Sequence, residues 1–280
     1  MAPRLLIVPT PIGNLGDITA RALESLQEAD VIYVEDTRRS GMLLQHFGIK
    51  KPLKSLFKGN EKARSMAALE ELRQGRTVAL VSDAGTPGIS DPGEFLIQSA
   101  IAEGFAVEAL PGAQAILPAL LLSGLPPTPF TFFGFLPRTS AARRATLREL
   151  GSIPWTLVFY EAPHRLAAML ADVQAVLGER PAAVVREISK LHEETRRSTL
   201  GELARWAREE QVRGEIVVAV AGMPPQDPHD TTVPLAAFVA DRLAQGDSPA
   251  ATARQARDAG YPRQEAYREA LRQKGKTQES

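Results

Sequence analysis

The sequence predicts an α/β protein: two α/β domains followed by a small helical segment. Two observations lead to this prediction. Short apolar runs rich in β-branched residues alternate with amphipathic segments, a pattern typical of parallel strands joined by helical crossovers. Several of these runs end in loops rich in glycine, proline and acidic residues, as at Val78–Gly93. Because an α/β sheet binds ligands beyond the carboxyl ends of its strands, the same pattern predicts a small-molecule site.

The first α/β domain is expected over residues 1–125. Its strands and helices follow from the alternation of apolar runs with amphipathic segments. In this domain we expect Asp91 to cap a helix whose first residue is Pro92. The expected strands are Leu5–Val8, Val31–Val34, Val78–Val81 and Ala106–Leu110, and the expected helices are 19–29, 38–47, 61–73 and 92–103.

The second α/β domain is expected over residues 126–223, after a short, stiff, proline-rich connector. The last domain, 233–275, follows a polar linker and holds three short helices. The spacing of the final two helices resembles a helix-turn-helix. The expected strands of the second domain are Phe130–Phe135, Thr156–Tyr160, Ala182–Arg186 and Ile216–Ala221, with helices at 141–149, 163–177 and 199–209; the last domain has helices at 234–245, 249–258 and 263–273.

Composition excludes several classes of protein. The 33 basic and 33 acidic residues balance, so any contact with nucleic acid must come from local patches. Cysteine is absent, which excludes disulfides and thiolate catalysis. No signal-peptide core or apolar stretch of bilayer length is present, so we expect a cytoplasmic protein without a membrane partner. The four histidines have no metal-ligand spacing, so we predict no metal site.

Three familiar motifs are missing. No G-x-G-x-x-G follows an early strand, and no G-x-S-x-G elbow is present. The tail reads Gly275-Lys276-Thr277, but Ala270 stands where a phosphate-binding loop needs its first glycine. The usual dinucleotide, serine-hydrolase and P-loop chemistries are therefore not supported.

What remains is a set of loops at the ends of strands. Val8–Thr19 is a stiff turn that serves equally well as an ordinary connection or as a ligand loop. Glu35–Arg39 places two arginines at a helix start, where the dipole disfavours them, and this favours an anionic partner. Leu110–Ala115 offers small residues and an amide, although close packing explains its glycine equally well. Phe159–Arg165 and Arg186–Glu194 add dense charge to the second sheet.

Five of these loops, taken in order, resemble a known family. They are Val8–Leu15, Glu35–Arg38, Ser82–Pro87, Gly134–Pro137 and Phe159–Arg165. As a set they are similar to the bacterial 16S ribosomal RNA (cytidine-2′-O)-methyltransferases, the ribosomal RNA small subunit methyltransferase I family of the tetrapyrrole-methylase superfamily. The likeness covers roughly residues 4–222.

The resemblance implies two α/β domains of tetrapyrrole-methylase type that hold S-adenosylmethionine in the cleft between them, usually as a homodimer. It also implies methylation of a cytidine in the decoding region of 16S rRNA, on naked RNA or on the 30S subunit. The glycine-aspartate-proline loop of the superfamily falls on Ala84–Thr86, so the acid has moved to Asp83. The cofactor contacts implied by position are Pro9, Asp83, Ala84, Gly85, Gly88, Gln114, Ala115, Tyr160, Glu161 and Ile188.

One departure concerns Phe57–Glu61. Relatives tend to have histidines before an Asn-Glu pair, whereas this chain has Phe57-Lys58-Gly59. A role for those histidines therefore cannot be transferred, although Asn60 and Glu61 remain candidates.

Methyl transfer to a ribose hydroxyl needs positioning and gains from a general base. Three acids at strand ends are candidates for that base: Asp36, which we place first, Glu35 and Glu187. The capping of a helix is an equally good explanation of Asp36. Lys190 is a candidate for stabilising a developing alkoxide or a neighbouring phosphate.

Local basic patches support contact with RNA, because phosphate backbones attract such patches and a tetrapyrrole does not need them. Solubilising surface charge is the alternative explanation. Two other functions also stay open: methylation of a tetrapyrrole carbon, and a non-catalytic role as an RNA-binding assembly factor. The predicted RNA contacts are Arg38, Arg39, Lys54, Lys58, Lys62, Arg138, Arg143 and Arg144, and the last helices carry further arginines.

Overall fold

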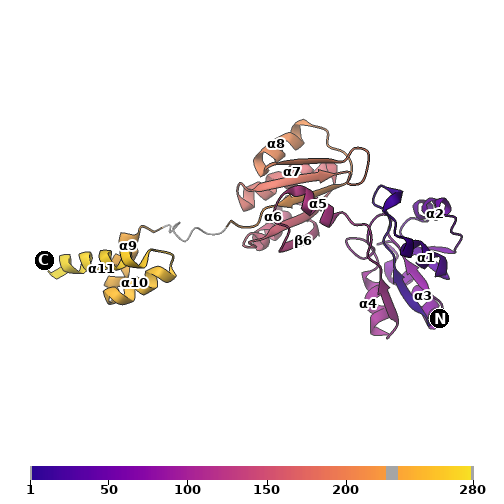
Figure 1. Cartoon of the computed structure of the whole chain (residues 1–280), viewed down its shortest axis with the longest axis horizontal. Helices are drawn as coiled ribbons and strands as arrows, with labels where there is room; N and C mark the ends of the chain where they lie inside the picture. The colour runs from indigo at the N-terminus through magenta and orange to yellow at the C-terminus, as the bar shows by residue number, and fades with distance from the viewer. Residues whose placement is uncertain (1, 225–232, 279–280) are drawn as a thin grey trace. The chain divides into compact units, whose positions relative to one another are not determined.

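The computed structural model describes residues 2–224 and 233–278 (Figure 1). The chain divides into two compact units, Met1–Met223 and Pro224–Ser280. The first unit contains two sheets of five strands each. We call the first sheet with helices α1 to α4 the first lobe, and helix α5 with the second sheet and helices α6 to α8 the second lobe.

The first sheet is parallel, as predicted, with the strand order β3-β2-β4-β1-β5. Its middle strands are buried, apolar and β-branched, as expected for a sheet covered on both faces. β3 was not predicted because its three residues are only half-buried and include a lysine. The strands are β1 (Arg4–Ile7), β2 (Val31–Val34), β3 (Leu53–Ser55), β4 (Val78–Leu80) and β5 (Ala106–Ala109).

Alternate side chains of each strand supply two separate cores. Leu5 and Ile7 point to the core under α3 and α4, whereas Leu6 and Val8 point to the core under α1 and α2. Because the strands of this sheet are parallel, the loops after β1, β2 and β4 lie at the same edge of the sheet. The helices are α1 (Ala20–Glu28), α2 (Thr37–His46), α3 (Glu61–Arg73) and α4 (Glu94–Ala102), with a short 3-10 turn η1 (Leu15–Asp17).

Two helix starts in the first lobe are held in different ways. Thr19 caps α1 by accepting a hydrogen bond from the Ala22 N–H at 3.1 Å. The prediction that Asp91 caps α4 is wrong. Gly93, with φ of +130°, precedes the helix instead, and its N–H is held by Glu61 at 2.8 Å. Because that backbone conformation cannot continue a helix, Asp91 stays in the loop after β4.

The second sheet has the order β6-β7-β10-β8-β9 and is mixed. β10 runs antiparallel to both β7 and β8, so β7 and β8 end at the same edge. The sequence did not reveal β9, because this edge strand has the polar sequence ETRRST. The strands are β6 (Phe130–Phe135), β7 (Thr156–Glu161), β8 (Pro181–Arg186), β9 (Glu194–Thr199) and β10 (Ile216–Val220), and the helices are α6 (Ser140–Leu150), α7 (Pro163–Leu177) and α8 (Leu200–Glu209).

Helix α5 (Ile116–Ser123) packs on the second sheet, although its sequence precedes the predicted boundary at residue 125. Its Ala119 and Leu120 join Val158, Val185 and Val217 in one core cluster on the face opposite α6 to α8. The helix is apolar on nearly every side, so its sequence alone could not indicate which sheet it covers.

The second unit contains α9 (Leu235–Ala244), α10 (Pro249–Asp258) and α11 (Arg263–Gln278). Ser248 caps α10, which begins at Pro249 as predicted. Tyr261 packs against Phe238 in the small core of this unit, whereas Tyr267 is exposed. The predicted linker falls largely on 225–232, outside the described residues. In the described part of the chain, no helix is long and apolar enough to cross a membrane.

Candidate active site

The loops after β1 and β4 are joined by backbone pairing. Thr10 and Gly85 exchange two backbone hydrogen bonds of 2.9 Å each, and the Thr10 hydroxyl donates to the Ser82 carbonyl at 3.0 Å. Gly85 has φ of +82°, and a side chain there would project toward Ile12 and the Ala113 carbonyl, 3.5 and 3.9 Å from its Cβ. Three strand-end loops therefore converge on Gly85.

The edges of the two lobes meet near these loops. A Cβ on Gly134, in β6, would lie 3.0 Å from the Ser90 hydroxyl in the loop after β4. Tyr160, at the end of β7, stacks edge-on against Phe132 with ring centroids 4.9 Å apart. Burial raises the pKa of Tyr160 to about 12, and the negative charges of Asp91 and Glu215 add to this. The structure thus brings Asp91 of the first lobe close to Tyr160 of the second.

Of the predicted cofactor residues, Pro9, Ala84, Gly85 and Gly88 belong to the converging loops of the first lobe. Gln114 has a role that sequence analysis missed. Its side-chain oxygen accepts hydrogen bonds from the N–H groups of Ile116 at 2.7 Å and Leu117 at 3.1 Å. Gln114 therefore caps the start of α5 and links the loop after β5 to the second lobe. Ala115, the next residue, immediately precedes α5.

Glu161, a predicted cofactor contact, is the last residue of β7. Its carboxylate is buried, accepts from the Ala162 N–H at 2.8 Å and pairs with Arg165 at 3.2 Å. Burial raises the pKa of Glu161, while the Ala162 N–H and the Arg165 charge partly oppose the rise. One carboxylate oxygen is thus held at the start of α7, whereas the other, Oε2, is buried and has no hydrogen-bond partner in the described part of the chain. The cofactor contact at Glu161 stays a prediction.

The loop after β8 carries two residues in left-handed conformations, Glu187 with φ of +55° and Ser189 with φ of +64°. They flank Ile188, which packs in the core beside α5. Lys190 donates to Glu187 at 2.9 Å and to Glu215 at 3.1 Å. Such strain is typical of functional loops, where surrounding contacts hold it in place.

Lys190 also touches the first lobe. A Cβ on Gly13, in the loop after β1, would come within 2.3 Å of the Lys190 side chain. Burial alone would raise the pKa of Glu187, but hydrogen bonds from the Glu215 N–H and Lys190 lower it overall. Glu187 is therefore a paired carboxylate that positions Lys190, and it is a poor choice for the general base.

Four carboxylates gather at the edge of the first sheet: Glu35, Asp36, Asp83 and Asp91. Asp36 caps α2 through the Arg38 N–H at 2.8 Å, and hydrogen bonds from Arg38 lower its pKa to about 2. The capping explanation of Asp36 is confirmed, and so low a pKa makes it a weak base. Burial raises the pKa of Glu35, and the charges of Asp91, Asp83 and Asp36 raise it further against the opposing effect of Arg39.

Asp91, which sequence analysis assigned only to a helix cap, lies among these acids. Burial raises its pKa, a hydrogen bond from Ser82 lowers it, and the Asp83 charge raises it again. Its charge raises the pKa of Glu35, which places Asp91, in the loop after β4, near Glu35, in the loop after β2. The signal available in the sequence was the position of Asp91, eight residues after Asp83 in a rigid loop.

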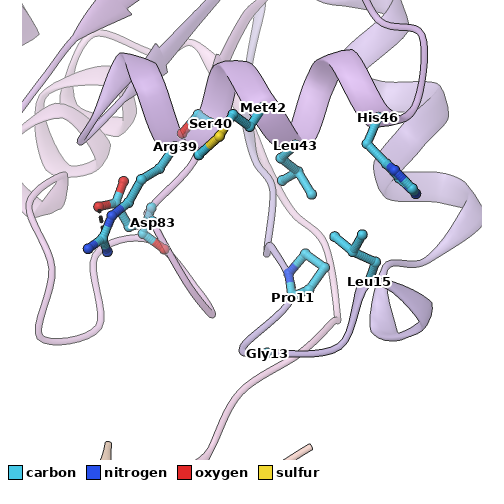
Figure 2. Close-up of a pocket in the computed structure, with 10 residues that line it drawn as sticks. Pro11, Gly13, Leu15, Arg39, Ser40, Met42, Leu43, His46 and Asp83 are labelled. Carbon is cyan, nitrogen blue, oxygen red and sulfur yellow. Dashed lines mark hydrogen bonds and ion pairs between the residues drawn. The ribbon is translucent and has the colours of Figure 1, made fainter. Parts of the chain in front are cut away.

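Asp83 turns its carboxylate toward α2. One oxygen accepts from the Asp36 N–H at 3.0 Å, and the other lies 3.5 Å from Arg39 (Figure 2). Beside this pair, α2 and the loops after β1 and β4 enclose a hollow of about 400 Å³. The hollow is lined by Pro11, Gly13, Leu15, Arg39, Ser40, Met42, Leu43, His46, Ser82 and Asp83.

The predicted RNA contacts divide into exposed and paired residues. Arg143 is a correction: its guanidinium is buried, pairs with Asp172 at 2.6 Å and also donates to two backbone carbonyls of the Pro137 turn. Arg144 pairs with the same Asp172 at 2.6 Å. This network holds α6 against α7, so Arg143 is not available to a phosphate.

The other predicted contacts lie nearer the surface. Lys58, Lys62 and Arg138 are exposed, and Arg38 and Arg39 are exposed but paired with Asp36 and Asp83. Lys54 is half-buried and pairs with the buried Glu71. Two candidates named from the resemblance also have structural roles, because Asn60 accepts from the Phe57 N–H at 2.8 Å and Glu61 from the Gly93 N–H.

Comparison with known proteins identifies one family. Residues 4–204 match the model of the tetrapyrrole (corrin/porphyrin) methylases. The chain is 44% identical to ribosomal RNA small subunit methyltransferase I of Escherichia coli O157:H7, over 97% of this chain and 96% of that protein. It is also 44% identical to the protein of the same name from Pseudomonas aeruginosa, over 99% of both chains.

Solved structures show the same fold at lower identity. Uroporphyrin-III C-methyltransferase from Thermus thermophilus, complexed with S-adenosyl homocysteine, has a TM-score of 0.56 and 22% identity, and the match covers 78% of this chain and 97% of that one. A diphthine synthase has a TM-score of 0.61 and 17% identity, covering 78% of this chain and 90% of that one. The match confirms the predicted two-lobed α/β architecture of the first unit.

Proposed function

The chain belongs to the ribosomal RNA small subunit methyltransferase I family of the tetrapyrrole methylases, and on that premise we propose that it methylates the ribose 2′-hydroxyl of a cytidine in the decoding region of 16S rRNA. It is an S-adenosylmethionine-dependent methyltransferase of small-subunit ribosomal RNA. The choice of cytidine, the 2′-oxygen and the decoding region is our proposal. Homodimer formation and a cytoplasmic location belong to the same proposal.

The observation that supports this function best is the convergence of strand-end loops from both lobes. The backbone around Gly85, the start of α5 and the end of β7 lie at one place. The charge nearby suits a sulfonium donor, because Glu35, Asp83 and Asp91 lie close enough together at the edge of the first sheet for Asp83 and Asp91 to raise the pKa of Glu35. The residues present therefore fit the cofactor, which when bound supplies an electrophilic methyl group.

In the proposed mechanism, the first-lobe loops around Gly85 and the second-lobe loop around Ile188 hold the donor and exclude water. Glu35 accepts the proton of the 2′-hydroxyl. A base whose pKa is raised by burial and by neighbouring acids matches this task better than Asp36, whose pKa is about 2.

Lys190 provides the opposite charge for the reaction. Burial lowers its pKa, but Glu187 and Glu215 raise it overall, so the ammonium group stays charged. The aliphatic part of its side chain lies against Gly13, in the loop after β1 of the first lobe. From this position the ammonium group stabilises the developing alkoxide or a neighbouring phosphate.

The exposed residues Lys58, Lys62 and Arg138 are the proposed phosphate contacts. They position the RNA and do not read its sequence. Arg38 and Arg39, at the start of α2, lie closest to the acids of the site and complete the proposed RNA surface.

The test is incubation of the purified full-length protein with 30S subunits and methyl-labelled S-adenosylmethionine, followed by digestion to nucleosides. We expect the label in 2′-O-methylcytidine. Label on a base carbon or nitrogen, or transfer to a tetrapyrrole and not to RNA, would contradict the proposal. Binding of the cofactor without transfer to any RNA would favour an assembly factor.

A further inference from the structure

The hollow beside α2 lies next to the cofactor loops, and the proposed function gives it no ligand. It has about 400 Å³, within the range of about 300–1,000 Å³ that is usual for small-ligand sites. Figure 2 shows Leu43, Pro11 and Leu15 around its centre, with Arg39 and Asp83 at one end. The hollow is thus an apolar slot with a charged end.

Its apolar walls face solvent. Met42 is 65% exposed and Leu15 is 44% exposed, although both are large hydrophobic residues. Exposed apolar side chains around a hollow, next to a site of chemistry, are typical of a binding surface. A flat, partly apolar ligand would cover them.

The charged end offers a donor beside an acceptor. The Asp83 carboxylate oxygen that faces Arg39 is 3.5 Å from the guanidinium, and the Arg39 side chain is 69% exposed. At that distance the pair is weak, and both groups retain hydrogen-bonding capacity. The backbone N–H of Asp36 holds the other Asp83 oxygen at 3.0 Å, which fixes the direction of the carboxylate.

This pattern complements one nucleobase. The Watson–Crick edge of cytosine presents an amino donor beside two acceptors, and a carboxylate accepts from that amino group while an arginine donates to the acceptors. Uracil presents a carbonyl where cytosine has its amino group, and that carbonyl would face the Asp83 carboxylate. Enzymes that act on one nucleotide commonly take its base out of the stack into such a pocket.

We propose that this hollow holds the base of the target cytidine, with Arg39 and Asp83 reading its Watson–Crick edge and Met42 and Leu15 covering its faces. The inference rests on the proposed function and adds the group that selects cytidine. The location supports it, because Ser82 and Asp83 line the hollow and lead directly into Ala84 and Gly85 of the cofactor loop. Glu35 feels the charges of both Asp83 and Arg39, so the attached ribose would lie near the proposed base.

The experiment compares 30S subunits reconstituted with cytidine or uridine at the methylated position. The wild-type protein should prefer cytidine by tenfold or more in kcat/KM, on the order of one well-made base contact. Asp83→Asn keeps an oxygen for the Asp36 N–H but places an amide where the carboxylate stood. We expect this variant to lose most of the preference when both substrates are compared at saturating S-adenosylmethionine, with the cofactor affinity measured separately by calorimetry.

A second variant tests the apolar wall. Met42→Gln should raise the KM for 30S subunits about tenfold and leave cofactor affinity unchanged, on the order of the loss of one buried apolar side chain. Met66→Gln is the matched control, because Met66 is a 46% exposed methionine on α3 that does not line the hollow. It should leave the KM unchanged.

The outcomes separate this inference from the proposed function. If the wild-type protein methylates cytidine and both Asp83→Asn and Met42→Gln keep its KM and its preference for cytidine, the hollow does not hold the base, and the proposed function stands. If Asp83→Asn weakens both substrates equally, Asp83 positions the RNA without reading the base, which also overturns the inference. If the wild-type protein transfers no methyl group to the 2′-oxygen of cytidine, the proposed function fails and this inference fails with it.

Discussion

The two lobes use their charged strand-end residues in opposite ways. In the second lobe, Glu161 pairs with Arg165, and Glu187 pairs with Lys190, so each acid stabilises its own loop. In the first lobe, Glu35 and Asp91 lie among other acids, and the pKa of each is raised. Burial also raises the pKa of Glu161, so a raised pKa alone does not separate the lobes; the difference is that Glu161 and Glu187 each have a cationic partner nearby in sequence. We therefore assign the general base to the first lobe and the stabilising ammonium group of Lys190 to the second.

The largest expected effect comes from the loop after β4. Gly85→Val should abolish measurable binding of S-adenosylmethionine, because a branched side chain is strained at φ of +82° and projects toward Ile12 and the Ala113 carbonyl. Calorimetry measures the binding. Gly104→Val is the control: φ is +79° there, and nothing lies within 4 Å of the added Cβ. Equal cofactor affinity in the two variants would remove Gly85 from the site.

The next effect separates the two acids after β2. Glu35→Gln should lower kcat by about 10²–10⁴-fold, the usual contribution of a general base, with little change in cofactor affinity. Asp36→Asn should retain far more activity, because an asparagine still caps α2. Methylation of 30S subunits measures both. A larger loss in Asp36→Asn than in Glu35→Gln would reverse the assignment.

The pH dependence of Glu35→Gln sharpens this test. Because the pKa of Glu35 is raised in the folded protein, its contribution to stability is complete at low pH and is lost as the pH rises through the folded pKa. The glutamine variant should therefore be at least as stable as the wild type at neutral pH and lose that advantage in acid. Urea unfolding at several pH values measures the free energy of unfolding. A variant that is less stable at neutral pH would show that the ionised Glu35 is stabilised by its surroundings.

The buried Arg143–Asp172 pair of the second lobe should affect folding and not chemistry. Asp172→Ala should cost about 3–5 kcal/mol of the free energy of unfolding, because it leaves the buried Arg143 without its partner. Burial alone would raise the pKa of Asp172, but hydrogen bonds from Arg144, Ser140 and Arg143 lower it overall. The contribution of Asp172 is thus present above its unfolded pKa and is lost as the pH falls through the folded pKa.

Urea unfolding at neutral and acidic pH measures this effect. A loss at neutral pH that shrinks in acid would confirm that the charge of Asp172 matters. The same loss at every pH would show that only packing changed.

The smallest effect belongs to the RNA surface. Reversing Lys58 and Lys62 to glutamate should weaken binding to 30S subunits and reduce the slope of log affinity against log salt by about two, one for each lost phosphate contact. Arg205→Glu with Arg208→Glu is the control, since both arginines are exposed on α8, outside the predicted patches. Equal losses in the two double variants would mean that the effect is one of net charge.

Sequence predicted several elements at their observed residues. They are β2, β6, α3 and α7. The apolar run of β2 is buried throughout, and α7 has distinct ends at Pro163 and Gly178. β3 and β9 were missed because both are polar edge strands, whose pairing depends on a neighbour and not on their own composition.

The site was predicted only in part, for a related reason. Glycine at Gly85 was correctly associated with a tight loop, since a positive φ leaves a sequence signature. The roles of Asp36, Glu161 and Arg143 depend on which partner each side chain meets, and those partners come from distant residues such as Asp172 or from the start of a helix. Charge alone could not distinguish a paired group from a free one.

The central claim is that the loops of both lobes form one site for the methyl donor, and a crystal structure of the protein with S-adenosylhomocysteine tests it most directly. We expect the ligand to contact the backbone at Ala84 and Gly85 on one side and the residues around Tyr160 and Ile188 on the other. A ligand bound away from Gly85, or contacting the first lobe alone, would contradict the account.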